Sequence, residues 1–386
     1  MQQDIVFSFF LIFSGALVLA TLALYTRQPV LIAYIALGAL IGPFGFGLIE
    51  HPESVADMAD IGILFLLFLL GLDMQPSALF AVVRKALPVA LASSAVFFLA
   101  GFGLPVVFGF TLQDGIIIGL AMMFSSTIIG LKLLPTTVLH HKHMGELMIG
   151  LLLLQDMLAI LVLILLGVME GNGTMPVWQP FAALPLIAAA CYLIVKGALL
   201  PLITRFDRFQ EYLFILAIGW CLAVAEAAKL VGLTHEIGAF IAGVTLATSP
   251  IAQYIAISLK PLRDFFLVMF FFALGAQFNL QLLSDVALPA IVLAIVVLGL
   301  KPVAFRVLLG RFSERRELAW DVGFRLGQIS EFSLLIAFVA TESSLLSEQG
   351  ALLIQATAIL TFVVSSYIVV FNYPNPIAVS ERLRRD

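Results

Sequence analysis

An acidic residue stands in the middle of one of the most apolar stretches of this sequence. Residues 150–167 read GLLLLQDMLAILVLILLG, and sixteen of these eighteen residues are apolar or glycine. A carboxylate at the centre of a lipid-buried helix costs about 2.5–3.5 kcal/mol on insertion scales. No residue one turn away neutralises Asp156, so its side chain must face a partner helix or a water-filled cavity, or else carry a proton.

Asp156 is therefore the first candidate for an ion- or proton-binding group. Burial and a neighbouring cation shift the pKa of a carboxyl group in opposite directions, so a site that combines them can exchange protons near neutral pH. A buried acid with a purely structural role is the alternative. The paired acids of an intramembrane protease are not indicated, because no GxGD-like second acid accompanies Asp156.

Polar residues interrupt two other apolar stretches. FSSTIIG (124–130) contains Ser125, Ser126 and Thr127, and FRLGQISEF (324–332) is more polar still. The second segment contains Arg325, Gln328, Ser330 and Glu331. Neither pattern suits an uninterrupted helix that faces lipid, which predicts two broken helices whose freed backbone groups line a cavity.

Lys301 lies deep within a further apolar stretch. It precedes Pro302 in LAIVVLGLKPVAF and stands about fifteen residues into its span. At that depth, snorkelling to the headgroups would strain the side chain. We therefore expect Lys301 to pair with Asp156 or with an opened backbone carbonyl, and snorkelling remains the alternative.

The composition shows that these residues lie in a membrane protein. Of the 386 residues, 62% are hydrophobic and 11% are charged, and the mean hydropathy of +1.12 excludes a water-soluble domain. Apolar runs of about 20 residues predict an all-α polytopic membrane protein with thirteen spans. The predicted spans are 5–25, 29–48, 57–80, 86–110, 114–134, 146–169, 178–202, 211–230, 235–248, 260–279, 286–309, 318–340 and 349–371.

The distribution of Lys and Arg orients these spans. With the N-terminus outside, sixteen of the 20 Lys and Arg residues fall in inner loops or at the inner ends of spans, and only Lys229 falls on the outer side. The positive-inside rule therefore predicts an odd number of spans and a cytoplasmic C-terminus. Residues 1–373 form the predicted transmembrane domain. Residues 374–386 form a cytoplasmic tail, which is either a basic anchor at the lipid surface or the start of a linker to a soluble domain.

The positions of the two polar interruptions indicate a transporter. They fall in the fifth and twelfth spans, and an odd separation of seven spans makes them cross the membrane in opposite directions. Inverted repeats have this arrangement, and matched interrupted helices at the midplane are the usual pointer to a transport site. A cation channel and a sodium-coupled organic-anion symporter, with Arg325 binding the anion, remain alternatives.

Several other function classes find no support in the sequence. No Cys or carboxylate pairs at ligand spacing with His140, His141 or His143, so we expect no metal beyond a transported cation. No glycine-rich phosphate-binding loop precedes a soluble βαβ unit, so ATP-driven transport is not indicated. We accordingly expect no enzymatic activity, no cofactor and no nucleic-acid partner.

A family resemblance covers essentially all thirteen spans and is carried by seven stretches. They are LGALIGPFGFG, LFLLFLLGLDMQP, MMFSSTIIG, LLLQDMLAI, GAFIAGVTLATS, PLRDFFLVMFFFALG and FRLGQISEFS. With them the chain resembles the membrane domain of the cation:proton antiporter-2 family, and within it the Kef-type potassium/proton antiporters.

The resemblance implies a sodium/proton antiporter-like fold with inverted repeats and two crossed discontinuous helices. It implies a homodimer in a cell inner (plasma) membrane, with spans 4–6 and 11–13 as a mobile core and the other spans mainly as a dimerisation scaffold. The implied function is secondary active potassium/proton antiport by elevator-type alternating access, with sodium/proton antiport as the alternative. Membrane lipids and a cytoplasmic nucleotide-binding regulatory domain or ancillary subunit are the other implied partners.

The resemblance also assigns roles to individual residues. Asp156 would bind cation and proton in competition, and the hydroxyl groups of Ser125, Ser126 and Thr127 would supply oxygens. Gln155 stands where electrogenic relatives have a second acid, which favours electroneutral exchange. The residues that would support the site or compensate its charge are Lys301, Gln328, Glu331 and Arg325. The loop SPIAQYIAISLKPLRD lacks the acidic run of Kef proteins gated by glutathione.

Overall fold

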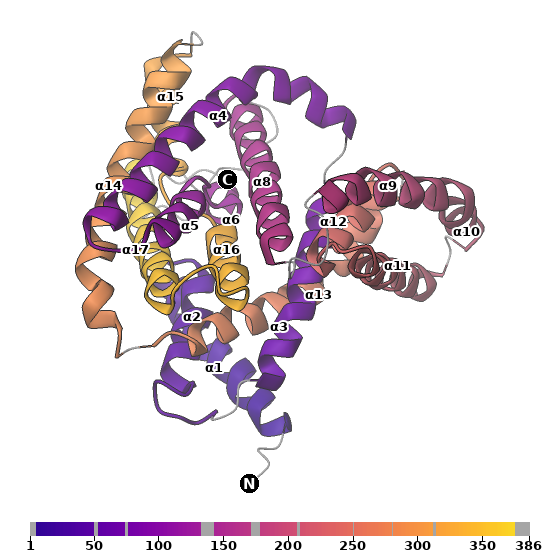
Figure 1. The fold of residues 1–386 in the computed structure, drawn as a ribbon, viewed down its shortest axis with the longest axis horizontal. Coiled ribbons are helices and arrows are strands. Elements are labelled where there is room, and N and C mark those ends of the chain that lie inside the picture. The colour runs from indigo at the N-terminus through magenta and orange to yellow at the C-terminus, as the bar shows by residue number, and fades with distance from the viewer. Residues whose placement is uncertain are drawn as a thin grey trace. The chain divides into compact units, whose positions relative to one another are not determined.

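A computed structural model describes residues 5–49, 53–73, 76–132, 143–170, 178–206, 209–249, 251–279, 281–311 and 314–374. Within these ranges the regular structure is entirely helical, with no strand (Figure 1). Seven of the described helices are long and apolar enough to cross a membrane, and four shorter helices are also apolar. The prediction of an all-α polytopic membrane protein is confirmed.

Each expected span overlaps at least one helix. The helices are α1 (Ile5–Tyr25), α2 (Val30–Ile41), α3 (Glu53–Asp73), α4 (Pro76–Val107), α5 (Leu112–Met122), α6 (Thr127–Lys132), α8 (His143–Glu170), α9 (Trp178–Ile194), α10 (Leu200–Phe206), α11 (Gln210–Leu230), α12 (His235–Leu246), α13 (Ala252–Ala276), α14 (Leu283–Arg311), α15 (Arg316–Arg325), α16 (Glu331–Glu342) and α17 (Glu348–Asn372). A π-helical turn, η1 (Val195–Leu199), joins α9 to α10.

Several helices begin before the predicted spans, and α4 and α13 do so by the widest margin. α4 begins at residue 76 rather than 86, and α13 begins at residue 252, within the stretch that we expected to be a loop. Proline suits the first turn of a helix, so Pro76 is compatible with the early start of α4. An apolar run marks the part of a helix that suits lipid, whereas the helix itself can continue among charged residues. The part of α4 that could span a membrane begins at Ala86, as predicted. The loop expected over SPIAQYIAISLKPLRD was wrong, because α13 begins within it.

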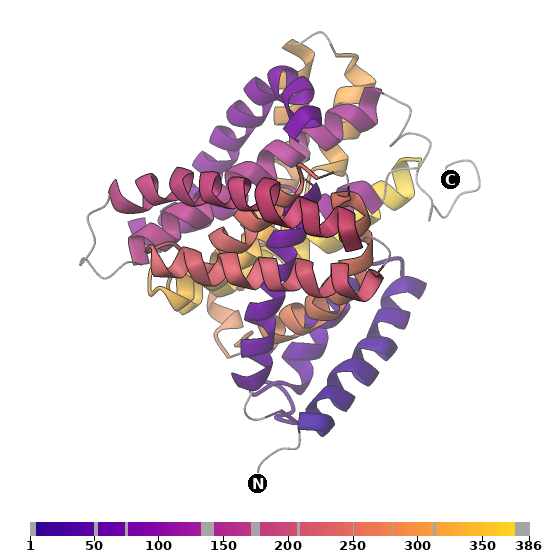
Figure 2. The ribbon, with the colours of Figure 1, turned by 90° about the vertical axis from the view of Figure 1, so that its right-hand side faces the viewer.

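The larger of two compact units comprises Met1–Glu50, Ala81–Val162 and Leu274–Asp386. Within it, α14 packs against α15 and α17, and α16 packs against α5 and α17 (Figure 1). A hydrophobic core fills the space among α4, α8, α14 and α15, where the rings of Phe97 and Phe305 meet edge-on with centroids 5.6 Å apart. α1 packs against α2 (Figure 2). It exposes many apolar side chains, which suits contact with lipid.

The smaller unit comprises His51–Phe80 and Leu163–Ala273. Its central contact joins α3 to α12, which also packs against α11. Gly71 and Gly243 allow this close approach, because a Cβ atom on Gly243 would overlap the carbonyl oxygen of Phe68. Small residues at helix contacts are typical of membrane bundles.

Both predicted helix interruptions are present, and both lie in the larger unit. α5 ends at Met122 and α6 begins at Thr127, while α15 ends at Arg325 and α16 begins at Glu331. The short non-helical segments between them carry Ser125, Ser126, Gln328 and Ser330. Thr127, Arg325 and Glu331 are the adjoining helix ends. The assignment of whole spans to a mobile core or a scaffold stays a prediction.

Candidate functional site

Asp156 lies on α8 and faces the start of α6. It is 1% exposed, and the Thr127 hydroxyl lies 3.1 Å from its Oδ2 and 3.3 Å from its Oδ1. Thr127 is the first residue of α6, so the interruption of the helix brings this hydroxyl to the carboxylate. A buried carboxylate beside the end of a half-helix can hold a proton or a cation.

Gln155, Ser125 and Ser126 shape the backbone of the first break, which is the non-helical segment between α5 and α6. The backbone N–H of Ser125 donates to Oε1 of Gln155 at 3.0 Å, and the Ser125 hydroxyl donates to the Leu326 carbonyl at 2.8 Å. Oγ of Ser126 accepts a hydrogen bond from the Ile129 N–H at 3.1 Å and so caps α6. All three side chains are fully buried. Their contacts fix the non-helical segment between α5 and α6.

The second break, which is the non-helical segment between α15 and α16, forms hydrogen bonds with the region of the first break. Ser330 caps α16 in a reciprocal pair with Ser333, and the Ser333 hydroxyl also donates to the Ala121 carbonyl at the end of α5. Nε2 of Gln328 donates to the Ser126 carbonyl at 3.4 Å. Polar side chains of one break therefore satisfy backbone groups of the other, as expected where non-helical backbone is buried in protein.

Glu331 brings a second acid to this region. It is the first residue of α16, it is 7% exposed, and its charge repels that of Asp156. A bound proton or cation relieves the repulsion between two buried carboxylates. The sequence directed attention to position 155 for a second acid, whereas the structure supplies one from the other broken helix.

Lys301, on α14, bridges the two breaks. Its ammonium group donates to the carbonyl oxygens of Phe124 and Gln328, the latter at 3.0 Å, and lies 3.2 Å from Oγ of Ser125. Three N–H donors thus meet three acceptors. The nitrogen also lies 5.0 Å from the centroid of the Phe97 ring, and the side chain is 0% exposed. Of the two expected partners, the structure supplies the opened carbonyls.

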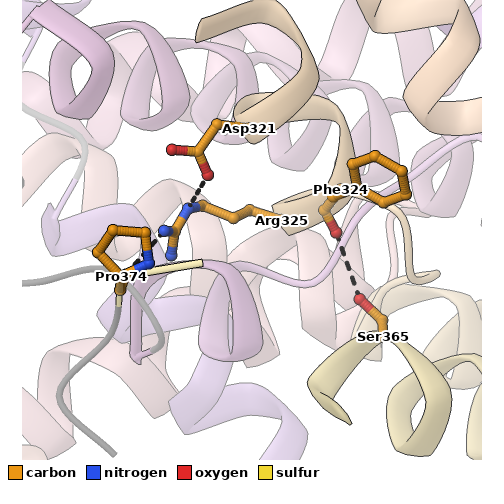
Figure 3. A network of polar contacts seen from close by, with 5 residues as sticks. All are labelled: Asp321, Phe324, Arg325, Ser365 and Pro374. Carbon is orange, nitrogen blue, oxygen red and sulfur yellow. Dashed lines mark hydrogen bonds and ion pairs between the residues drawn. The ribbon is translucent and has the colours of Figure 1, made fainter. Parts of the chain in front are cut away.

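Arg325 faces the end of the last helix (Figure 3). Its Nε donates to Oδ1 of Asp321 at 2.6 Å, and its Nη2 donates to the Pro374 carbonyl at 2.8 Å. The guanidinium carbon also lies 5.7 Å from the centroid of the Tyr373 ring. These contacts tie α15 to the chain as it leaves α17.

Two hydroxyl groups of α17 also contact the second break, and they were not predicted from the sequence. Oγ1 of Thr361 accepts a hydrogen bond from the Ile329 N–H at 3.4 Å, and the Ser365 hydroxyl donates to Oε1 of Gln328 at 2.7 Å. Thr361 and Ser365 are four residues apart and share a helix face. That spacing was visible in the sequence, but hydroxyl groups in apolar helices often bond to their own backbone, which made the signal weak.

The Thr127 hydroxyl oxygen contacts the Asp156 carboxylate. Oxygen ligands suit hard cations, whereas nitrogen and sulfur ligands select transition metals. Among the described residues, no group of three His, Cys, Asp or Glu side chains could hold a metal ion. Of the three histidines noted above, His140 and His141 lie outside the described residues and His143 begins α8.

Sequence comparison relates the chain to known transporters. The family model described as "Sodium/hydrogen exchanger, transmembrane" matches residues 10–371. YbaL of Escherichia coli (strain K12), named as a cation/proton antiporter, is 31% identical over 363 residues, which cover 91% of this chain and 65% of YbaL. K(+) efflux antiporter 4 of Arabidopsis thaliana is 30% identical over 352 residues, which cover 87% of this chain and 58% of that protein. The chain therefore spans 58–65% of the length of these relatives.

A solved structure shares the fold. The sodium proton antiporter MjNhaP1 from Methanocaldococcus jannaschii superposes with a TM-score of 0.70 at 16% identity, covering 95% of this chain and all of that one. Interrupted helices that meet at a buried polar site are typical of many secondary transporters. The chain belongs to the sodium/hydrogen exchanger transmembrane family, and its resemblance to the Kef-type cation:proton antiporters is confirmed.

Proposed function

We propose that this chain is the membrane domain of a secondary active monovalent cation:proton antiporter in which Asp156 binds either ion. The observation that carries the proposal is the buried carboxylate of Asp156 beside the Thr127 hydroxyl at the start of a half-helix. A carboxylate in a low-dielectric environment is costly when bare and tolerable when neutralised by a proton or a cation. Membership of the sodium/hydrogen exchanger family supports the same activity.

Competition for one carboxylate is the proposed coupling mechanism. A cation that binds Asp156 displaces the proton, and a proton that binds displaces the cation. Whichever ion is bound neutralises the site, and only the neutralised core crosses the barrier at low cost. Thr127 supplies a ligand oxygen, while Gln155, Ser125 and Ser126 keep the first break in shape.

Four further residues support the site in this proposal. Lys301 and Gln328 join the two breaks, so that both half-helix ends move as one piece. Glu331 adds negative potential that attracts a cation, and Arg325 fixes the end of α15.

Potassium is the proposed cation, and the proposed exchange is electroneutral. Similarity to K(+) efflux antiporter 4 supports potassium over sodium. Gln155 is neutral, so one proton exchanges for one cation at Asp156 and no net charge crosses the membrane.

The proposed assembly is a homodimer in which the core moves relative to the scaffold in an elevator-like manner. Spans 4–6 and 11–13 form the core in this proposal, and the other spans form mainly the scaffold. The chain is a multi-pass membrane protein, for which we propose an inner (plasma) membrane, an outer N-terminus and a cytoplasmic C-terminus. A nucleotide-binding regulatory domain or ancillary subunit is a proposed partner, since the relatives are longer than this chain. We propose no cofactor and no enzymatic activity, with K+ or Na+ and H+ as the transported species.

The proposal is tested by adding cations to proteoliposomes that contain a pH-sensitive dye. Potassium added outside the vesicles should enter the lumen in exchange for protons, so that the pH of the lumen rises. A response to sodium alone would favour sodium/proton antiport. Sodium-dependent uptake of an organic acid would favour the symporter, and currents that do not change with pH would favour a channel.

A further inference from the structure

Ser365 lies between the last helix and the second break. Its hydroxyl lies 2.7 Å from Oε1 of Gln328 and 3.5 Å from the carbonyl oxygen of Phe324, and the latter contact is drawn in Figure 3. Both acceptors lie outside α17, although a serine in a helix commonly returns its proton to the preceding turn of its own backbone. The hydroxyl therefore acts between helices, and its shorter hydrogen bond goes to the Gln328 side chain.

That hydrogen bond sets the orientation of the Gln328 amide. Of the two polar atoms of the amide, only the oxygen can accept the Ser365 proton, so the amide nitrogen faces the other way, 3.4 Å from the Ser126 carbonyl oxygen. The reverse orientation would place Oε1 of Gln328 against that carbonyl, and two acceptors repel each other. Gln328 is 0% exposed, so water does not readily replace either contact.

The Ser126 carbonyl belongs to the peptide unit that begins α6. Ser126 caps this half-helix, and the next residue, Thr127, contacts Asp156. Because the peptide unit is planar, holding its carbonyl also restrains the position of Thr127. The orientation of the Gln328 amide is thereby linked to the distance between the Thr127 oxygen and the Asp156 carboxylate.

We propose that Ser365 is a positioning residue for the cation site. Its hydroxyl orients Gln328, Gln328 holds the Ser126–Thr127 peptide unit, and that unit sets the Thr127 oxygen against Asp156. The inference rests on the proposed antiport function. Loss of the Ser365 hydroxyl loosens the oxygen atoms around the cation while the carboxylate itself stays intact. It therefore weakens cation binding and reduces the discrimination between potassium and sodium, with little effect on the maximal rate.

Ser366 provides a matched control for this proposal. It is the next residue on α17, it is 0% exposed, and its hydroxyl has no hydrogen-bond partner among the described residues. In proteoliposomes we expect Ser365→Ala to raise the apparent KM for potassium about three- to tenfold, the effect of losing one hydrogen bond. Ser366→Ala should keep the wild-type KM, and Ser365→Thr should recover it because the hydroxyl is restored. If Ser365→Ala does not fold, Ser365→Cys takes its place in the comparison with Ser366→Ala, because cysteine is similar in size to serine and a weaker donor.

The rise in Tm with potassium concentration provides a second measurement, because it reports binding without transport. Ser365→Ala should need about three- to tenfold more potassium than Ser366→Ala for the same rise. Equal KM values and equal potassium dependence of Tm for these two variants would overturn the role of Ser365 and leave the antiport proposal standing. A wild-type protein that neither exchanges a cation for protons nor gains stability from one would overturn both.

Discussion

The Thr127 hydroxyl lies 3.1 Å and 3.3 Å from the two carboxylate oxygens of Asp156, although the residues are 29 positions apart in the sequence. The contact arises because the fifth span stops at Met122 and restarts at Thr127. The restart places Thr127 at a half-helix end, where backbone N–H groups are not yet paired within the helix. The interruption therefore turns an apolar span into one wall of a polar site.

Removing the Thr127 hydroxyl should weaken cation binding. We expect Thr127→Val to raise the apparent KM for potassium by about tenfold, because hydrogen bonds and dipole contacts to charged groups contribute roughly 1.5–3 kcal/mol. Thr127→Ser keeps the oxygen and should retain a KM close to that of the wild type. Potassium titrations in proteoliposomes measure the difference, and equal KM values for the two variants would argue against Thr127 as a ligand.

Lys301 should contribute to stability through the two carbonyls that it joins. Lys301→Ala leaves the carbonyl oxygens of Phe124 and Gln328 without this donor in a buried site, at about 1–3 kcal/mol each. We therefore expect a clearly lower Tm for the purified variant. The matched control is Lys229→Ala, because Lys229 is exposed on α11 and its removal should change stability by no more than about 0.5 kcal/mol. Equal Tm values for both variants would contradict the bridging role.

Two Arg–Asp pairs allow a comparison of buried and exposed charge. Arg325 and Asp321 are 2.6 Å apart with side chains 1% and 22% exposed, whereas Arg263 and Asp264 are 2.9 Å apart with side chains 33% and 55% exposed. Arg325→Lys should lower Tm, because lysine lacks the planar fork that reaches both Asp321 and the Pro374 carbonyl. Arg263→Lys should have almost no effect, as expected for an exposed ion pair. Thermal unfolding of both variants measures the contrast, and a larger loss for Arg263→Lys would be the opposite of our expectation.

Gln155 offers a test of the proposed stoichiometry. Gln155→Glu keeps an oxygen that can accept from the Ser125 N–H and adds an ionisable group next to Asp156. We expect exchange to become sensitive to an imposed membrane potential, because a second proton can now move with each cycle. Wild-type exchange should be insensitive to that potential. A wild-type rate that changes with membrane potential would reject electroneutral exchange and point to Glu331 as a second carrier of charge.

Both breaks and the principal carboxylate were predictable from the sequence. Hydroxyl and charged residues in FSSTIIG and GQISEF are incompatible with a continuous helix in lipid, so an interruption was the physical consequence of composition alone. Asp156 was identified for the same reason, since a lone acid in an apolar run requires compensation.

The identity of the carbonyls that Lys301 contacts and the role of α17 were not predictable in this way. Hydrophobic periodicity tells which face of a helix is buried, but not which of several acceptors a long side chain reaches. The choice of the Phe124 and Gln328 carbonyls depends on the two breaks lying side by side, which is a tertiary relationship. Ser365 was missed because a single hydroxyl in an apolar helix has an ordinary local explanation. The early start of α13 was missed because charges were taken to end the helix when they end only its apolar part.

The Asp156→Asn variant tests the central claim most directly. Asparagine has nearly the same size and can still contact Thr127, but it can neither take up a proton nor neutralise a cation. The measurement is the proton flux in dye-loaded proteoliposomes after a potassium pulse, with the Tm of the purified variant as a check on folding. We predict a folded protein with no potassium-dependent proton movement at any pH. Exchange at the wild-type rate in Asp156→Asn would contradict the assignment of Asp156 as the shared binding group.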